Sequence, residues 1–375
     1  MVEMAEIFQR HGAAYRANYG DRMLPSHRKA MRDIERCRTL ELGGHVYSCA
    51  TCEETIYQYH SCRDRHCPKC QNGRAQQWLE KRQGDLPAAR YFMLTFTLPA
   101  ELRRMARSHQ KLFYHLLFRT SADAVQKLGH DPRFVGGRMG MVSVLHTWGR
   151  NLAYHPHVHL LVPGGGLTED GTWLPSRANF LLPVRALSRL FRAKFRDGLR
   201  QRDPEIFGTI PPQVWKKEWV MHSQAVGNGL RALKYLAPYI FRVAISNRRI
   251  VRLADGTVTF LYRTTDTGKL RTCKLPAGEF IRRFLQHVLP KGFVKVRYYG
   301  FLAPACRPQL VALRQLLGPL TTHDSPDSGV HNEPGATTEL DFSAPNPVLC
   351  PSCGRPMHRR PIRPGEQCPQ ALAPP

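Results

Sequence analysis

The chain has 375 residues, 42% of them hydrophobic, and carries 55 Lys and Arg against 29 Asp and Glu, a formal net charge of +26. This composition excludes a disordered chain and permits one large core with smaller modules. No stretch approaches the roughly 20 consecutive apolar residues of a membrane span, so we expect no membrane partner. A positive surplus of this size favours nucleic acid as the partner, because bound phosphates release counterions. A solvated basic surface is the alternative.

The cysteines indicate a reducing compartment. The N-terminal residues Met1 to Glu6 are acidic and lack the basic region and apolar run of an export signal. The eleven cysteines are therefore expected to be thiols or metal ligands and not disulfides. We predict a cytoplasmic protein.

Strand and helix patterns alternate irregularly along the chain. Apolar runs that predict strands lie at 91–99, 139–146, 157–162, 215–221, 250–253, 258–263, 270–275 and 294–298. Periodic patterns predict helices before residue 40 and at 73–81, 102–128, 187–195, 230–235 and 276–288. This mixture, without a strict strand–helix rhythm, predicts an α+β fold around a mainly antiparallel sheet.

Two tight cysteine pairs lie in the N-terminal part. Cys49 and Cys52 form one pair and Cys67 and Cys70 the other, with fourteen residues between the pairs. Four thiolates at this spacing predict a tetrahedral structural zinc site in a small ribbon-like domain. Such a site has no open coordination position, so its expected role is to fold the domain and present basic loops. Spare candidate ligands are His45, His60, Cys62, His66 and Cys37, of which Cys62 could replace one of the four or be a buried thiol.

A further cysteine pair lies near the C-terminus. Cys350 and Cys353 follow a stretch at 320–347 that is rich in Ser, Thr, Asp, Pro and Gly, which suggests a linker. With His358 and Cys368 downstream, the pair predicts either a second small ribbon or a tail with incidental cysteines.

Two histidines stand one residue apart on a predicted strand. Side chains alternate between the faces of a strand, so His157 and His159 point to the same face and can hold a divalent metal. A third ligand must come from elsewhere. Gln224 and Asn228 offer amide oxygens for it, although either equally suits a helix cap. A histidine pair satisfied in the core or at a solvent edge is the alternative.

Two tyrosines lie four residues apart on a predicted helix. Tyr235 and Tyr239 share one helix face and can present two hydroxyl nucleophiles to one place. Pro238 lacks the N–H that a helix interior needs, so the helix kinks or ends between them. A metal that polarises a phosphate and a tyrosine that attacks it are the parts of a DNA strand-transfer enzyme. Two tyrosines packed in a core are the alternative.

Five blocks of sequence carry a family resemblance between about residues 30 and 305. They are 62–71, His157-Val158-His159, the pair Tyr235 and Tyr239, 242–247 and 279–293. Together they resemble the HUH-type, two-tyrosine transposases of the IS91 group of rolling-circle insertion sequences.

The resemblance implies an organisation and a set of functional residues. It implies a zinc-binding domain at 1–84, an HUH endonuclease core with an antiparallel sheet flanked by helices at 85–305, and a linker and tail at 306–375. By this likeness His157 and His159 bind a catalytic Mg²⁺ or Mn²⁺. Candidate DNA contacts from basic side chains are Arg63, Arg65, Lys69, Lys234 and Arg242.

The resemblance also implies a reaction. The tyrosines Tyr235 and Tyr239 would nick and rejoin single-stranded DNA through 5′-phosphotyrosine intermediates during rolling-circle transposition. The partners would be the element's ends, target DNA and the host replication machinery, at the bacterial nucleoid. A plasmid or phage replication initiator with the same chemistry is one rival. A zinc-ribbon DNA-binding protein without catalysis is the other.

Overall fold

The structure is a computed structural model that describes residues 2–71, 86–228, 231, 240, 244–264, 267–318 and 347–366. Its helices are α1 (Met4–Tyr19), α2 (Pro25–Glu35), α3 (Pro68–Gln71), α5 (Arg103–Ser108), α6 (Gln110–Gly129), α7 (Val184–Arg202), α8 (Pro204–Gly208), α10 (Ala277–Leu285) and α11 (Arg307–Leu317). Its longer strands are β1 (Gly44–Ser48), β2 (Thr55–Tyr59), β3 (Arg90–Thr97), β5 (Met141–Trp148), β6 (Tyr154–Pro163), β9 (Met221–Asn228), β10 (Ile250–Ala254), β11 (Thr257–Arg263), β12 (Leu270–Pro276), β13 (Val296–Tyr299) and β14 (His358–Ile362). A small sheet is formed by β4 (Arg138–Met139), β7 (Gly165–Leu167) and β8 (Trp173–Pro175).

This mixture of helices and antiparallel strands confirms the predicted α+β fold class. None of the helices in the described ranges is long and apolar enough to cross a membrane.

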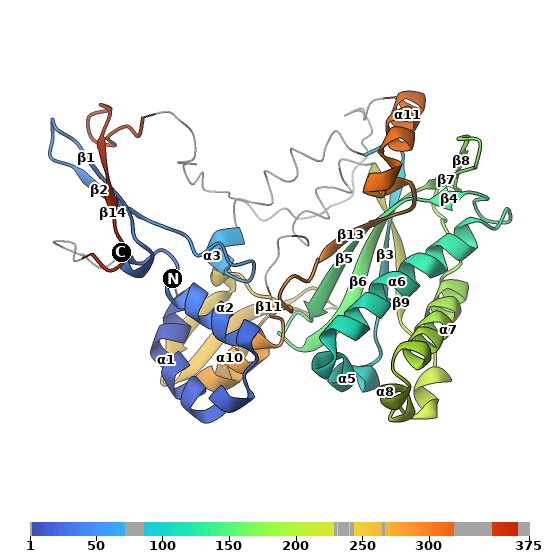
Figure 1. The fold of residues 1–375 in the computed structure, drawn as a ribbon, viewed down its shortest axis with the longest axis horizontal. Coiled ribbons are helices and arrows are strands. Elements are labelled where there is room, and N and C mark those ends of the chain that lie inside the picture. The colour runs from blue at the N-terminus through green and yellow to red at the C-terminus, as the bar shows by residue number, and fades with distance from the viewer. Residues whose placement is uncertain are drawn as a thin grey trace.

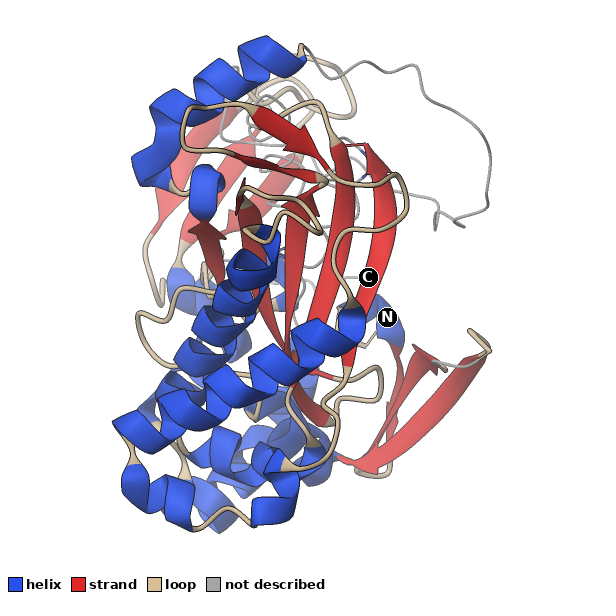
Figure 2. Ribbon diagram, turned by 90° about the vertical axis from the view of Figure 1, so that its right-hand side faces the viewer, coloured by secondary structure: helices blue, strands red, loops and turns tan. Residues whose placement is uncertain are grey.

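The largest sheet has the strand order β13-β5-β6-β3-β9, and all neighbouring strands are antiparallel. Figures 1 and 2 show α6 and α7 lying across one face of this sheet. On β6 the alternate residues Val158, Leu160 and Val162 enter a core that also contains Phe113 of α6 and Phe195 of α7. The period-two alternation of β6 therefore commits one face to helix packing.

The opposite face of the same sheet is divided into two parts. At one end Leu161 of β6 packs with Tyr91 and Met93 of β3 in a second hydrophobic cluster. At the other end the same side of β6 carries His157 and His159, which are half-buried. This end of the face therefore carries polar side chains where the other end carries apolar ones.

The N-terminal helices pack against elements that come more than 200 residues later. Phe8 of α1 meets Phe284 of α10 edge to face, with ring centroids 5.5 Å apart. Helices α1 and α2 share a core with α10 and with the sheet β10-β11-β12. This packing does not follow the predicted division between residues 84 and 85, because residues on both sides of it form one core.

The C-terminal strand returns to the N-terminal part of the chain. β14 pairs with β1 along its full length, which gives a sheet in the order β14-β1-β2. In Figure 1 this sheet extends away from the helices, and both termini lie on its side of the molecule. The predicted linker and tail at 306–375 therefore includes two described elements, α11 and β14.

One predicted strand is wrong. Residues 215–221 were expected to be extended, but a 3-10 turn occupies Pro212–Trp215 and the strand begins at Met221. The prolines before Trp215 lack the N–H that a strand ladder needs. Trp219 instead packs into the helical core, with its ring 5.2 Å from that of Phe191.

Candidate metal centres

Three histidines lie close together on one face of the large sheet. His146 of β5 is the register partner of His157 on β6, and His159 lies two residues further along β6. We call these three residues the histidine cluster. One ring nitrogen of each lies within 4.8 Å of the others. The predicted pair is thus on one face as expected, and the structure adds a third imidazole from the neighbouring strand.

Hydrogen bonds from the surrounding chain orient two of the three rings. Nδ1 of His157 donates to the carbonyl oxygen of His155 (2.6 Å), and Nδ1 of His159 lies 3.1 Å from Oγ1 of Thr95 on β3. Because Nδ1 has a hydrogen-bond partner in both rings, Nε2 is the nitrogen through which either ring would bind a metal. The ring of His146 stacks on Trp148, with centroids 4.8 Å apart.

Burial keeps the imidazoles neutral. Desolvation is the main cause that lowers the pKa of His157 well below its usual value, and desolvation lowers the pKa of His159 to about 4. A neutral imidazole can bind a cation without first losing a proton. Three nitrogen donors fit a divalent ion that keeps positions open for water and phosphate oxygens. Such a donor set suits a transition ion such as Mn²⁺ better than Mg²⁺, which prefers oxygen.

The sequence did not identify His146 as the third candidate ligand. The two residues considered for that place, Gln224 and Asn228, lie on β9. Oδ1 of Asn228 accepts a hydrogen bond from the backbone N–H of Arg231 (3.1 Å), which is the capping role weighed as its alternative. The sequence feature that could have identified His146 is its place at the end of the predicted strand 139–146, which pairs with the strand of His157 and His159.

The predicted nucleophiles Tyr235 and Tyr239 lie outside the described residues, as do Lys234 and Arg242. The next described residue after Tyr239 is Ile240, which is buried.

Ile240 is tied to the neighbourhood of the histidine cluster. Nζ of Lys295 donates to the carbonyl oxygen of Ile240 (3.1 Å) and lies 5.0 Å from the centre of the Trp148 ring, which stacks on His146. Burial lowers the pKa of Lys295 to about 7. Lys295 therefore links Ile240 to the aromatic neighbour of His146.

The structure corrects the grouping of the predicted cysteine ligands. Cys67 and Cys70 lie with Cys37 and Cys62, a set that we call the inner cysteine cluster. The other predicted pair lies with two C-terminal cysteines in the outer cysteine cluster, which consists of Cys49, Cys52, Cys350 and Cys353. The predicted single site of Cys49, Cys52, Cys67 and Cys70 is wrong.

The β1-β2 hairpin explains the correction. Cys49 and Cys52 lie in the turn at its tip, whereas Cys62 lies just beyond its base. A five-residue strand is about 17 Å long, so the hairpin separates the two predicted pairs. Cys37 comes from the end of α2 and completes the inner cluster. Its Sγ lies 3.5 Å from that of Cys70.

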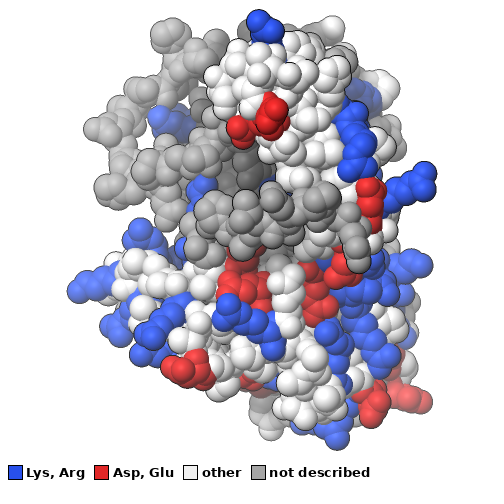
Figure 3. All heavy atoms as spheres, turned by 90° about the vertical axis from the view of Figure 1, so that its left-hand side faces the viewer, with Lys and Arg blue, Asp and Glu red and all other residues white. Residues whose placement is uncertain are grey.

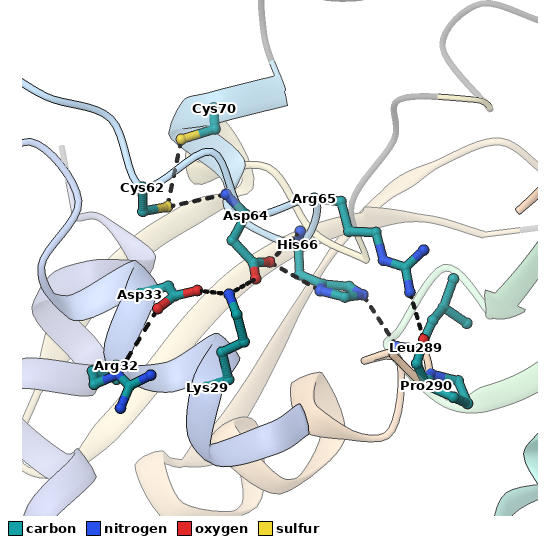
Figure 4. A network of polar contacts seen from close by, with 10 residues as sticks. All are labelled: Lys29, Arg32, Asp33, Cys62, Asp64, Arg65, His66, Cys70, Leu289 and Pro290. Atoms are coloured by element: carbon teal, nitrogen blue, oxygen red, sulfur yellow. Dashed lines mark hydrogen bonds and ion pairs between the residues drawn. The ribbon is translucent and has the colours of Figure 1, made fainter. Parts of the chain in front are cut away.

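The loop of the inner cluster is also hydrogen-bonded to the segment that precedes β13, an edge strand of the large sheet (Figure 4). The Asp64 carboxylate holds Nδ1 of His66 (3.0 Å), and Nε2 of His66 accepts from the backbone N–H of Leu289 (3.1 Å). Nη2 of Arg65 donates to the carbonyl oxygen of Pro290 (2.9 Å). These bonds join the cysteine loop to the segment that leads into β13.

The predicted DNA contacts in this loop have different surroundings. The guanidinium of Arg65 is committed to backbone carbonyls, and Lys69 forms an ion pair with Glu3 (2.5 Å). Both contacts support the fold, which argues against a role in binding DNA. Arg63 is exposed. Figure 3, which shows the left-hand side of the molecule in Figure 1, has Lys and Arg side chains spread over that face with acidic side chains between them.

Comparisons with known proteins define the class. Residues 7–98 match the family model of a transposase zinc-binding domain, and residues 140–309 match that of a putative transposase. These segments contain the inner cysteine cluster and the histidine cluster respectively. No solved structure shows a significant match. The chain is thus of the transposase class, with an N-terminal zinc-binding domain.

Two curated relatives make the family specific. A putative transposase, y4qJ, of Sinorhizobium fredii (strain NBRC 101917 / NGR234) is 43% identical over 338 residues, covering 84% of each chain. The transposase for insertion sequence element IS801 of Pseudomonas savastanoi pv. phaseolicola is 30% identical over 353 residues, covering 86% of this chain and 83% of that protein. The chain belongs to the IS91 family of transposases.

Proposed function

We propose that this transposase nicks and rejoins single-stranded DNA at the ends of its insertion sequence through 5′-phosphotyrosine intermediates, as an HUH endonuclease in rolling-circle transposition. One observation carries the proposal. Three ring nitrogens converge in the histidine cluster, which is the number of protein ligands typical of a catalytic metal site. In support, Lys295 donates to the carbonyl oxygen of Ile240 and lies over the Trp148 ring that stacks on His146. Family membership supplies the DNA substrate.

The histidines would hold the catalytic metal through their ring nitrogens. His155 and Thr95 would fix the rings of His157 and His159 so that little ordering remains when a cation binds. A bound Mn²⁺ or Mg²⁺ supplies charge neutralisation at the oxygens of the scissile phosphate. The neutral state of the imidazoles suits this role, because no proton has to leave before the ligands bind.

The tyrosines would carry the covalent chemistry. The hydroxyl oxygen of Tyr235 or Tyr239 attacks phosphorus and releases its proton to solvent. The bond from phosphorus to the 3′-oxygen breaks, and that oxygen takes up a proton to become a free 3′-hydroxyl. The phosphotyrosine conserves the phosphodiester bond energy, so rejoining needs no nucleotide triphosphate. The second tyrosine would cleave the next end, and attack by a 3′-hydroxyl would restore the first.

The inner cysteine cluster would hold a structural zinc ion. Its four sulfurs lie close enough for one ion, with Sγ of Cys62 at 3.5 Å from that of Cys70. Four thiolates close the coordination sphere, so this site supports the loop that binds Leu289 and Pro290 and takes no part in cleavage.

The test combines purified protein, single-stranded oligonucleotides covering both element ends, and Mn²⁺ or Mg²⁺. We expect a denaturant-resistant adduct on the strand 3′ of the nick, lost in the double variant Tyr235→Phe/Tyr239→Phe. His157→Ala should lower the rate by about 10³-fold or more, because metal stabilisation of the transition state is worth several kcal/mol. The single tyrosine variants rank the two nucleophiles.

The matched control is His130→Ala, which alters an exposed histidine at the end of α6 and should nick at the wild-type rate. Tight DNA binding without an adduct, at either end and with either metal, would sink the proposal in favour of a zinc-ribbon DNA-binding protein without catalysis.

A further inference from the structure

The C-terminal segment at 347–366 docks on the N-terminal hairpin. β14 pairs with β1 in an unbroken antiparallel register from Gly44 opposite Ile362 to Ser48 opposite His358. β1 is therefore the central strand of its sheet, with an N-terminal neighbour on one side and a C-terminal neighbour on the other. This register brings the turn after β1 to the turn before β14.

Those two turns have the same construction. In each, the first cysteine's backbone N–H donates to the carbonyl of the residue five positions later: Cys49 to Glu54 (2.9 Å) and Cys350 to Arg355 (2.8 Å). In each, the residue after the second cysteine has a positive φ, 56° in the first turn and 71° in the second. Two matching Cys-x-x-Cys turns are the two halves of a zinc ribbon.

The sulfur positions agree with a metal tetrahedron. Sγ of Cys49 lies 3.5 Å from that of Cys353, and Sγ of Cys52 lies 3.4 Å from that of Cys350 and 3.7 Å from that of Cys353. Zinc–sulfur bonds of about 2.3 Å at tetrahedral angles place sulfurs about 3.8 Å apart. Disulfide sulfurs would be about 2.05 Å apart, so these contacts are not disulfides.

The surroundings join the two halves as well. Cys49 and Cys350 are buried together with Tyr47 and Met357 in a small hydrophobic cluster that takes members from both ends of the chain. Polar contacts cross the same boundary. One joins Nη1 of Arg355 to Oγ1 of Thr51 (3.3 Å).

We propose that Cys49, Cys52, Cys350 and Cys353 bind a second structural zinc ion that fastens the C-terminal segment to the N-terminal hairpin. The family's zinc-binding domain ends at residue 98, so this site needs two ligands from outside it. The two halves of this zinc ribbon are 298 residues apart in the sequence, from Cys52 to Cys350. The strands of the large sheet lie between them along the chain. It does not depend on the DNA cleavage proposed above.

The first measurement is the zinc content of the purified full-length protein. All variants carry His157→Ala and His159→Ala, so that the histidine cluster does not contribute to the count. We expect two zinc ions per chain in this background and one after Cys350→Ser/Cys353→Ser. The control Cys273→Ser/Cys306→Ser, which removes cysteines outside both clusters, should keep two. One ion in the background protein, or two retained after Cys350→Ser/Cys353→Ser, would overturn the site.

The second measurement tests the fastening itself and does not rely on a metal count. A protease site is inserted within residues 321–346, and the chain is cut after folding. With the outer cysteines intact, the C-terminal fragment should stay bound through size-exclusion chromatography. It should separate after Cys350→Ser/Cys353→Ser. A fragment that stays bound equally well in that variant would show that strand pairing alone holds it, against the proposal.

Discussion

The histidine cluster and the inner cysteine cluster both gather metal-binding side chains, but they differ in ligand number and support. The histidine cluster offers three nitrogens from two paired strands, fewer than the four ligands of a closed site. The inner cysteine cluster offers four sulfurs, drawn from the end of α2 and the loop around α3, and closes the sphere. An open site can admit a phosphate, whereas a closed one can only stabilise the fold. The proposed catalytic site and the proposed structural zinc site therefore differ in ligand number.

The elements around each cluster reinforce this difference. The histidines sit on strands whose register is set by the whole sheet, so the sheet persists without a metal. The inner cysteines join short segments, and Cys37 and Cys67 are buried in the same core as α1 and α10. Loss of a ligand should therefore remove activity at the first site and stability at the second.

The largest expected effect is on stability, from Cys67→Ser. Removing one of four zinc ligands should lower the free energy of unfolding by more than about 3 kcal/mol, because metal binding contributes directly to folding. Denaturant titration measures the change, with Cys306→Ser as the control expected within about 0.5 kcal/mol of wild type. The comparison breaks if His159→Ala destabilises the protein as much as Cys67→Ser does.

A smaller effect is expected from Thr95→Val, which keeps the side-chain shape but removes the hydroxyl beside Nδ1 of His159. Metal affinity at the histidine cluster should fall by about 10–100-fold, because partners of this kind orient the ligand. The metal concentration that gives half-maximal nicking measures it. Thr95→Ser should restore the affinity. An unchanged metal dependence in Thr95→Val would mean that β3 only packs there.

The smallest expected effect is a pH dependence at His287, which is buried beside β5. Its Nδ1 lies 3.2 Å from Oγ1 of Thr147, and Nε2 donates to the carbonyl oxygen of Leu152 (3.2 Å). Desolvation is the main cause that lowers its pKa to about 4. Between pH 6.5 and 4 the unfolded chain binds a proton that the folded chain does not, so stability falls as the pH falls.

For one such histidine the loss is about 1 kcal/mol at pH 5.5 relative to pH 7.5. Unfolding of wild type and His287→Gln at the two pH values isolates this contribution, because all other groups titrate in both proteins. An equal loss of unfolding free energy in both proteins would show that His287 does not cause the pH dependence.

The sequence predicted local features of the sites well. The strands that carry His157 and Thr95 were expected close to their observed bounds, because apolar alternation sets them. Asp255 and Gly256, between the predicted strands 250–253 and 258–263, are a residue pair typical of a tight hairpin turn, and both have the positive φ that such a turn needs. Each of these features is decided by residues within one short window.

Features that depend on distant partners were not predictable in the same way. His146 lies beside the other histidines because of the register of β5 on β6. The pattern of residues within either strand does not predict that register. Cys49 and Cys52 were paired with the nearest suitable cysteines in sequence, but the hairpin carries them to Cys350 and Cys353 instead. Spacing pointed to Cys49/Cys52 and Cys67/Cys70 as metal-binding pairs, left Cys350 and Cys353 undecided, and could not say which pairs meet.

The pairing of β1 with β14 sets an order of events during synthesis. The last strand of the large sheet, β13, ends at Tyr299, so the whole sheet can assemble before Cys350 has been made. The hairpin at Cys49 must wait about 300 residues for its partner, roughly 15–60 s at ordinary translation rates. A chain that terminates early would therefore keep the histidine cluster but leave β1 with an unpaired edge. The β14-β1-β2 sheet thus distinguishes chains that extend through residues 358–362 from shorter ones.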